Sequence, residues 1–173
     1  TLKDFKNVEI INNDILEIES LKNYLKIKKL KIKNSSKTPS EIIDNGLLEY
    51  IGPKSPQTIL VAMGSVIGTI KDTIKESTEV GILKIKCFRP FPAEQILKII
   101  KSAKNIAVID KSISLGHIGP LASDIKAIAQ GRTQANISSF IVGLGGRDIT
   151  KEIIKTIIKQ AGKNFDGARF VGK

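Results

Sequence analysis

Between Thr58 and Gly162 the sequence alternates four times between a short apolar run and a segment with helically spaced apolar residues. We interpret the apolar runs as strands, at residues 58–63, 80–88, 105–110 and 137–142. Mostly apolar strands that alternate with helices are typical of a parallel sheet covered on both faces. The pattern therefore predicts a three-layer α/β domain with a mainly parallel sheet over residues 58–162.

The beginning of the chain is less regular and predicts a small α+β appendage. We expect a short strand at residues 8–11 and a helix that begins near Asp14. Residues 26–33 alternate lysine with isoleucine and leucine, which favours a half-exposed strand. This lysine run is either a contact surface for an acidic partner or a solvated edge guarded by charge, and the second interpretation is favoured. The first residue is Thr1 rather than Met, which suggests a processed protein or a piece of a longer one.

The segment before the regular domain contains an apparent helix signal. Thr38-Pro39-Ser40-Glu41 has the form of a capping box and predicts a helix that ends near Gly52-Pro53. A linker from Pro53 to Pro56 would follow, so residues 1–57 are expected to form an appendage and linker. Residues 163–173 are expected to be a tail that is loose or packed against something outside this chain.

The charge of the chain is strongly positive, with 28 Lys and Arg against 17 Asp and Glu and a formal net charge of +11. This excess invites a nucleic-acid interpretation. However, most lysines fall at helical spacing on solvated faces, only 5% of the residues are aromatic, and no Trp is present. No nucleic-acid-binding motif occurs either, so the sequence argues against nucleic acid as a partner.

Cys87 is the only cysteine, which excludes an internal disulfide and a cysteine-ligated zinc site or iron–sulfur cluster formed by this chain alone. Its apolar neighbours place it in the expected core. No signal peptide occurs, and no apolar run approaches the length of a membrane span. We therefore expect a cytoplasmic protein without a membrane partner.

The corners between strands and helices are the expected functional positions. Right-handed crossovers place them all at the carboxyl edge of the sheet, where open α/β proteins bind ligands or partners. The most pronounced corner runs from Gly143 through Arg147 and Asp148, and Thr150 can cap the helix that follows. It is not a dinucleotide fingerprint, because Asp148 stands where the last glycine would be. The edge is expected to gather Gly64, Ser65, Arg89, Asp110, Lys111, His117, Gly145, Gly146, Arg147 and Asp148.

Each of these residues has a simpler alternative role. Gly64-Ser65 before a helix could bind phosphate through backbone N–H groups, but a plain tight turn is favoured. Arg89 and Arg147 are held in positions suited to binding a carboxylate or phosphate. Arg147 could equally form a local ion pair with Asp148. His117, the only histidine, is expected to have a structural or interface role.

No self-sufficient reactive centre emerges from the sequence. It offers no nucleophile–base pair, no paired acid and base carboxylates and no cluster of metal ligands. We therefore predict no catalytic residue, no metal site and no cofactor bound by this chain alone.

Several motifs occur in an order that resembles one known family. They are Val61-Ala62-Met63-Gly64-Ser65, Val80-Gly81-Ile82-Leu83-Lys84-Ile85, Phe88-Arg89-Pro90-Phe91-Pro92, Ala107-Val108-Ile109-Asp110-Lys111 with Ser114 and Gly116, Gly119-Pro120-Leu121, and Gly143 to Thr150. Together they resemble the carboxyl-terminal domain of the alpha subunit of pyruvate:ferredoxin oxidoreductase and its 2-oxoacid:ferredoxin relatives. The resemblance covers roughly residues 58–160, and it is to the multi-subunit form of the enzyme. It implies a transketolase C-terminal-domain-like fold.

The resemblance also implies a division of labour. The whole enzyme decarboxylates a 2-oxoacid on thiamine diphosphate with magnesium, passes electrons through iron–sulfur clusters to ferredoxin and releases an acyl-CoA. The family's ligands for these cofactors lie in other subunits and in the N-terminal domain of the alpha subunit, and none of those motifs occurs here. The implied partners are that N-terminal domain, the beta, gamma and delta subunits and, indirectly, ferredoxin.

Three hypotheses follow. The domain is a scaffold whose carboxyl edge contacts other subunits and which is not catalytic alone. The alternative is a module that binds an anionic ligand, CoA or phosphate, at the same edge. The third and least favoured hypothesis is a basic nucleic-acid-binding domain, which would show steep salt dependence.

Overall fold

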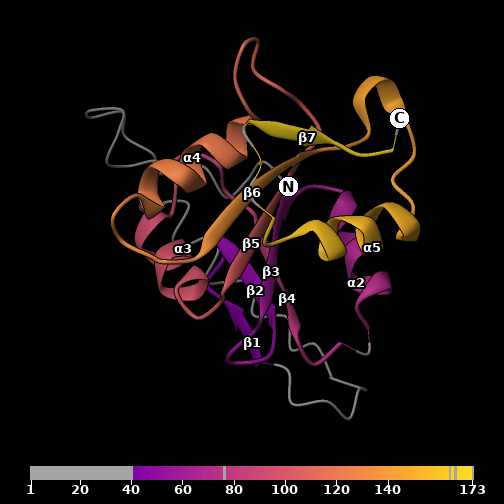
Figure 1. Cartoon of the computed structure of the whole chain (residues 1–173). Coiled ribbons are helices and arrows are strands. Elements are labelled where there is room, and N and C mark those ends of the chain that lie inside the picture. The colour runs from indigo at the N-terminus through magenta and orange to yellow at the C-terminus, as the bar shows by residue number, and fades with distance from the viewer. Residues whose placement is uncertain (1–40, 76, 164, 166, 173) are drawn as a thin grey trace, which may run out of the picture. The chain divides into compact units, whose positions relative to one another are not determined.

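The computed structural model describes residues 41–75, 77–163, 165 and 167–172 (Figure 1). The elements expected before residue 41, including the lysine run, lie outside these residues. The strands are β1 (Glu41–Asp44), β2 (Leu48–Gly52), β3 (Thr58–Met63), β4 (Val80–Ile85), β5 (Asn105–Asp110), β6 (Asn136–Ile141) and β7 (Ala168–Phe170). The helices are α2 (Val66–Thr73), α3 (Ala93–Ile100), α4 (Pro120–Ala129) and α5 (Lys151–Gln160), with a short 3-10 turn, η2 (Leu144–Gly146).

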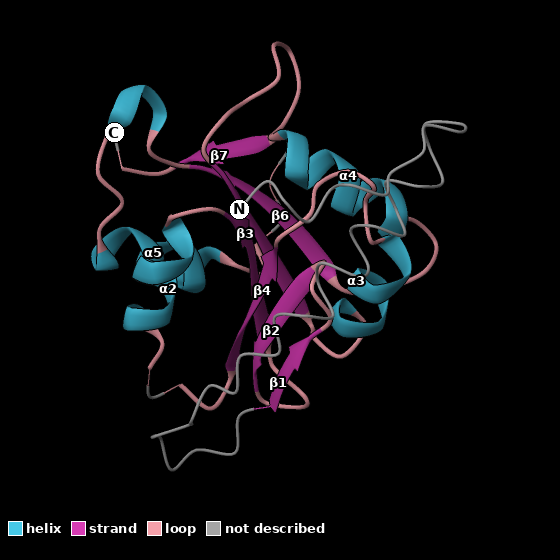
Figure 2. Ribbon diagram, turned by 180° about the vertical axis from the view of Figure 1, so that it is seen from behind, coloured by secondary structure: helices cyan, strands magenta, loops and turns pink. Residues whose placement is uncertain are grey.

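The strands form one seven-stranded sheet in the order β1-β2-β4-β3-β5-β6-β7. All neighbouring pairs from β4 to β7 are parallel, whereas β1 and β2 are antiparallel to their neighbours. Helices α2 and α5 cover one face and α3 and α4 cover the other (Figures 1 and 2). The predicted three-layer α/β fold with a mainly parallel sheet is therefore confirmed.

The central strand explains why apolar runs dominate the sequence. Ile59 and Val61 of β3 pack into the core beneath α3 and α4, and Leu60 and Ala62 pack into the core beneath α2 and α5. A strand covered on both faces needs apolar residues at successive positions rather than at alternate ones. The strands predicted at residues 58–63 and 105–110 match β3 and β5, and β4 ends three residues earlier than predicted.

The helix expected from the capping box is wrong, because Glu41–Asp44 and Leu48–Gly52 form an antiparallel hairpin. Its turn contains Asn45-Gly46, a strong hairpin signal, and the side-chain oxygen of Asn45 accepts hydrogen bonds from the N–H groups of Leu47 and Leu48 at 3.1 and 3.0 Å. Strand β2 pairs with β4, so the sheet extends into the region that the sequence assigned to an appendage.

The expectation of a loose tail is also wrong for part of its length. Ala168–Phe170 form β7, which pairs in parallel with β6 at the edge of the sheet. The Arg169 guanidinium carbon lies 4.9 Å from the centre of the Phe165 ring and secures this edge further. Within the described part of the chain, none of the helices has the length and apolar character needed to cross a bilayer.

Candidate functional site at the carboxyl edge of the sheet

The parallel register brings the four strand-to-helix corners to one edge. Met63 of β3 lies opposite Ile85 of β4, and Asp110 of β5 lies opposite Ile141 of β6. The chain therefore leaves β3, β4, β5 and β6 on the same side of the sheet. We call the residues of these corners the rim; it comprises residues 64–65, 86–92, 110–119 and 143–150. The order of strands reverses between β3 and β5, the position where folds of this kind bind ligands.

The corner after β5 uses its acid internally. The two carboxylate oxygens of Asp110 accept hydrogen bonds from the N–H groups of Leu121 and Ala122 at 3.0 and 3.1 Å, which closes the N-terminus of α4. A side chain at Gly119 would collide with this carboxylate, so the close approach requires glycine. Burial raises the pKa of Asp110 and the nearby Asp124 charge adds to the rise, although the two N–H groups oppose it. Asp110 at this corner therefore has a structural role, because it holds the N-terminus of α4 against the end of β5.

Arg89 lies at the corner after β4, as the sequence suggested. The carboxylate that it binds belongs to Asp124 of this chain and not to an external ligand. The Arg89 Nη1 atom donates to Asp124 of α4 and to the carbonyl of Phe88, both at 2.8 Å. The guanidinium carbon lies 4.0 Å from the centre of the Phe88 ring. Cys87 is half-buried rather than fully in the core, and its thiol donates to the carbonyl of Arg89 at 3.0 Å.

The corner after β6 is organised differently. Gly143, Gly145 and Gly146 all have positive φ angles, so the glycines turn the chain as expected. Thr150 accepts a hydrogen bond from the Ile153 N–H at 3.4 Å and caps α5, also as expected. Arg147 and Asp148 are both exposed, and within the described residues neither forms an ion pair. The described residues therefore contain no local Arg147–Asp148 ion pair. Both side chains are exposed to solvent.

The corner after β3 is the remaining candidate for an anion. Gly64 and Ser65 are exposed, and no side chain caps the N-terminus of α2. The N-terminus of α4, by contrast, is already occupied by Asp110. Of the two helix starts at the point where strand order reverses, that of α4 is capped by Asp110, and no side chain caps that of α2.

His117 lies in the loop between β5 and α4 and is exposed. It lines an open groove of about 540 Å³ beside α4, together with Ile118, Lys126, Gln130 and other residues. Sequence reasoning did not predict this groove, because residues of the loop, the helix and β6 form it only after folding.

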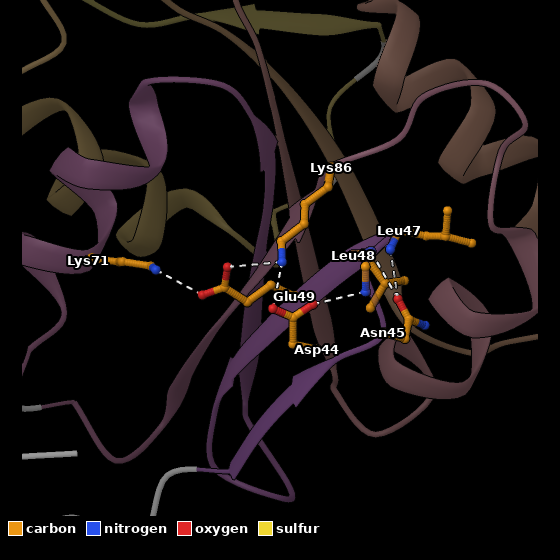
Figure 3. Close-up of polar contacts among 8 residues, drawn as sticks. Asp44, Asn45, Leu47, Leu48, Glu49, Lys71 and Lys86 are labelled. Atoms are coloured by element: carbon orange, nitrogen blue, oxygen red, sulfur yellow. Dashed lines mark hydrogen bonds and ion pairs between the residues drawn. The ribbon is translucent and has the colours of Figure 1, made fainter. Parts of the chain in front are cut away.

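The hairpin turn adds a charged cluster at the same edge (Figure 3). Lys71 of α2 lies 2.9 Å from one Glu49 carboxylate oxygen, and Lys86 lies 3.7 Å from the other. Lys86 also binds Asp44 at 2.6 Å. Burial alone would raise the pKa of Asp44, but the hydrogen bonds from Lys86 and Gly46 and the charges of Lys86 and Lys84 outweigh it and lower the pKa. The cluster ties the hairpin to α2 and β4.

The same residues offer few ligands for a metal or cofactor. Within the part of the chain that the structure describes, no three His, Cys, Asp or Glu side chains lie close enough together to hold a metal ion. Asp110 is committed to α4, and Cys87 is the only thiol of the chain. The described residues therefore do not fit magnesium or an iron–sulfur cluster, and we derive no reaction step through them.

Comparison with known proteins gives a consistent result. Residues 57–154, more than half of the chain, match the family described as "Pyruvate:ferredoxin oxidoreductase core domain II". Over 127 residues the chain is 48% identical to "Pyruvate synthase subunit PorA" of Methanocaldococcus jannaschii, covering 70% of this chain and 32% of that protein. Over 135 residues it is 34% identical to "Ketoisovalerate oxidoreductase subunit VorA" of Pyrococcus furiosus, covering 75% of this chain and 33% of that protein.

The chain thus spans about a third of the length of the curated relatives that it matches. A solved structure described as 2-oxoglutarate:ferredoxin oxidoreductase from Magnetococcus marinus is also similar, with a TM-score of 0.49 and 18% identity over 65% of this chain and 19% of that one. A likeness at that level carries no argument about function.

Proposed function

The chain belongs to the pyruvate:ferredoxin oxidoreductase core domain II family, and from that premise we propose that it serves as a subunit-contact domain in a 2-oxoacid:ferredoxin oxidoreductase. In this role it is the counterpart of one domain of the alpha subunit. The whole assembly oxidises a 2-oxoacid to an acyl-CoA and reduces ferredoxin. This chain supplies a rigid surface, and the reacting groups belong to other parts.

The corner after β6 is the observation that carries the proposal. Arg147 and Asp148 are exposed on a glycine-turned corner, without an ion-pair partner among the described residues. Three other charged rim residues, Asp110, Arg89 and Lys86, are engaged within the chain, whereas Lys111 is exposed like Arg147 and Asp148. A corner whose charges do not stabilise its own fold is suited to partners outside it.

The proposed partners are the remainder of the alpha subunit and the beta, gamma and delta subunits, with ferredoxin reached indirectly. Thiamine diphosphate, magnesium, iron–sulfur clusters and CoA are proposed for the complex and are assigned to those other parts. The similarity to a pyruvate synthase subunit and a ketoisovalerate oxidoreductase subunit supports a 2-oxoacid substrate, pyruvate or ketoisovalerate.

The experiment replaces Arg147 by Ala in the assembled complex, with Lys155→Ala on the exposed face of α5 as the matched control. We expect Arg147→Ala to lower the fraction of this chain that co-purifies with its partner subunits, and to lower 2-oxoacid-dependent ferredoxin reduction with it. The control should match the unsubstituted complex in both assays. Normal assembly and turnover of Arg147→Ala would contradict the proposed role of this corner.

A further inference from the structure

Leu115 is the most exposed large apolar side chain of the described residues, at 100% of its possible exposure. Ile43 and Phe170, the other two exposed large apolar residues, reach 38% and 45% and lie on the outer strands β1 and β7. Leu115 instead lies in the loop between β5 and α4, at the point on the rim where strand order reverses. The Leu115 side chain therefore contributes nothing to the core of this chain, and it becomes informative only together with the turn and the groove beside it.

The backbone around Leu115 is held in a defined turn. The Ser114 carbonyl accepts a hydrogen bond from the His117 N–H at 3.0 Å, and the Ser114 N–H donates to the Ile118 carbonyl at 3.2 Å. Gly116, the third residue of this turn, has a φ angle of 69°. A positive φ angle at the third position of a turn favours glycine. Ile118 is buried in the core and anchors the end of the turn. A pre-organised turn loses little conformational entropy when its apolar tip is bound.

The groove beside α4 begins next to this turn. His117 lines the groove and is two residues from Leu115 in the chain. Ile118 and Ile137 give the groove apolar lining. Among the described residues that line the groove, Lys126 has a formal charge and no Asp or Glu is present. The surface therefore combines an apolar tip, a partly apolar groove and positive charge.

We propose that Leu115 is an anchor for a protein partner, which encloses it in an apolar pocket and places an acidic segment in the groove beside α4. This inference rests on the proposed function and specifies which part of the rim the partner covers. The occupant is a segment of the oxidoreductase assembly outside this chain, since the chain spans about a third of its relatives' length.

Charge supports an acidic segment. Lys111 is exposed in the same loop and Lys126 lies in the groove, and within the described residues neither forms an ion pair. The nearby acids, Asp110 and Asp124, are already bound by the N-terminus of α4 and by Arg89. Complementary carboxylates on the partner would orient the contact, while burial of the leucine supplies affinity.

The test uses the complex purified from cells that produce this chain with its partner subunits. Its dissociation on dilution is measured by mass photometry for the unsubstituted chain, Leu115→Ala, Lys126→Glu and the control Ile43→Ala. Leu115→Ala is expected to weaken assembly about tenfold or more, as loss of an interface anchor does, and Ile43→Ala less than about twofold. Lys126→Glu should weaken assembly and reduce its dependence on salt.

The outcomes separate this inference from the proposed function. If the unsubstituted chain assembles and Leu115→Ala assembles equally well, the inference is wrong and the proposed function stands. If the unsubstituted chain does not assemble with the partner subunits at all, both fail. If Leu115→Ala leaves assembly unchanged but abolishes binding to phosphatidylcholine–phosphatidylglycerol vesicles, the leucine is a membrane contact and the inference is overturned.

Discussion

The corners after β5 and after β6 lie on the same edge of the sheet but use their charged residues in opposite ways. Asp110, at the first, is buried and spends both carboxylate oxygens on the N-terminus of α4. Arg147 and Asp148, at the second, are exposed and form no ion pair within the described residues, and Thr150 caps α5 in their place. A charged residue after a parallel strand is therefore not by itself a sign of binding; what matters is whether the fold has already used it.

The largest expected effect breaks the first corner. Asp110→Ala leaves two N–H groups of α4 without acceptors in a buried site, and we expect the free energy of unfolding to fall by about 2 kcal/mol or more. Asp148→Ala, its counterpart at the second corner, should change it by less than about 0.5 kcal/mol. Urea unfolding of the two variants measures both values, and similar losses would remove the distinction between the corners.

A smaller effect is expected from the cap of α5. Thr150→Ala removes the hydrogen-bond acceptor for the Ile153 N–H and should cost about 1 kcal/mol. Thr150→Ser keeps the hydroxyl and should cost less. Thermal unfolding of both variants compares them. If Thr150→Ala is as stable as the unsubstituted chain, some group other than Thr150 supports the second corner.

The smallest expected effect concerns pH and sets Asp110 against Asp44 of the hairpin. The pKa of Asp44 is lowered in the fold, so its contribution to stability is present above the unfolded value of 3.8 and is lost as the pH falls through the folded value. The pKa of Asp110 is raised, so ionisation costs the native state stability as the pH rises from 3.8 through the folded value.

Asp44→Asn should therefore reduce the fall in unfolding free energy that occurs as the pH drops below about 4. Asp110→Asn should remove a fall in unfolding free energy that occurs as the pH rises above about 4. Because Asp44 is 45% exposed, its effect should be only a few tenths of a kcal/mol. Unfolding free energies between about pH 2.5 and pH 6 would reveal both slopes. If the two substitutions change the slope of unfolding free energy against pH in the same direction, the opposite pKa shifts of Asp44 and Asp110 are contradicted.

The sequence predicts the layers of this fold well, because its strongest signals are local. The apolar runs of β3 and β5, and the isoleucines of α5, report burial directly. Its failures have physical causes. The capping-box pattern at residues 38–41 outweighed the hairpin signal of Asn45-Gly46, and the three residues of β7 form a strand only because β6 offers an unpaired edge.

The candidate site, too, was predictable from the sequence only in part. Parallel topology was sufficient to bring Gly64, Arg89, Arg147 and their neighbours to one edge. It could not show that Asp124 would bind Arg89 or that Asp110 would cap α4, because those contacts depend on the docking of α4. Leu115 was missed although its setting, a leucine between Ser114 and Gly116 in a polar loop, was visible in the sequence.

The account depends on the rim being the side of this domain that meets its partners. Hydrogen–deuterium exchange of the intact complex tests this directly, by comparing the rim segment 144–148 with the turn at residues 77–79, which precedes β4 at the opposite end of the sheet. We predict slow exchange at residues 144–148 and fast exchange at residues 77–79. Fast exchange at residues 144–148 with protection at residues 77–79 would contradict the account.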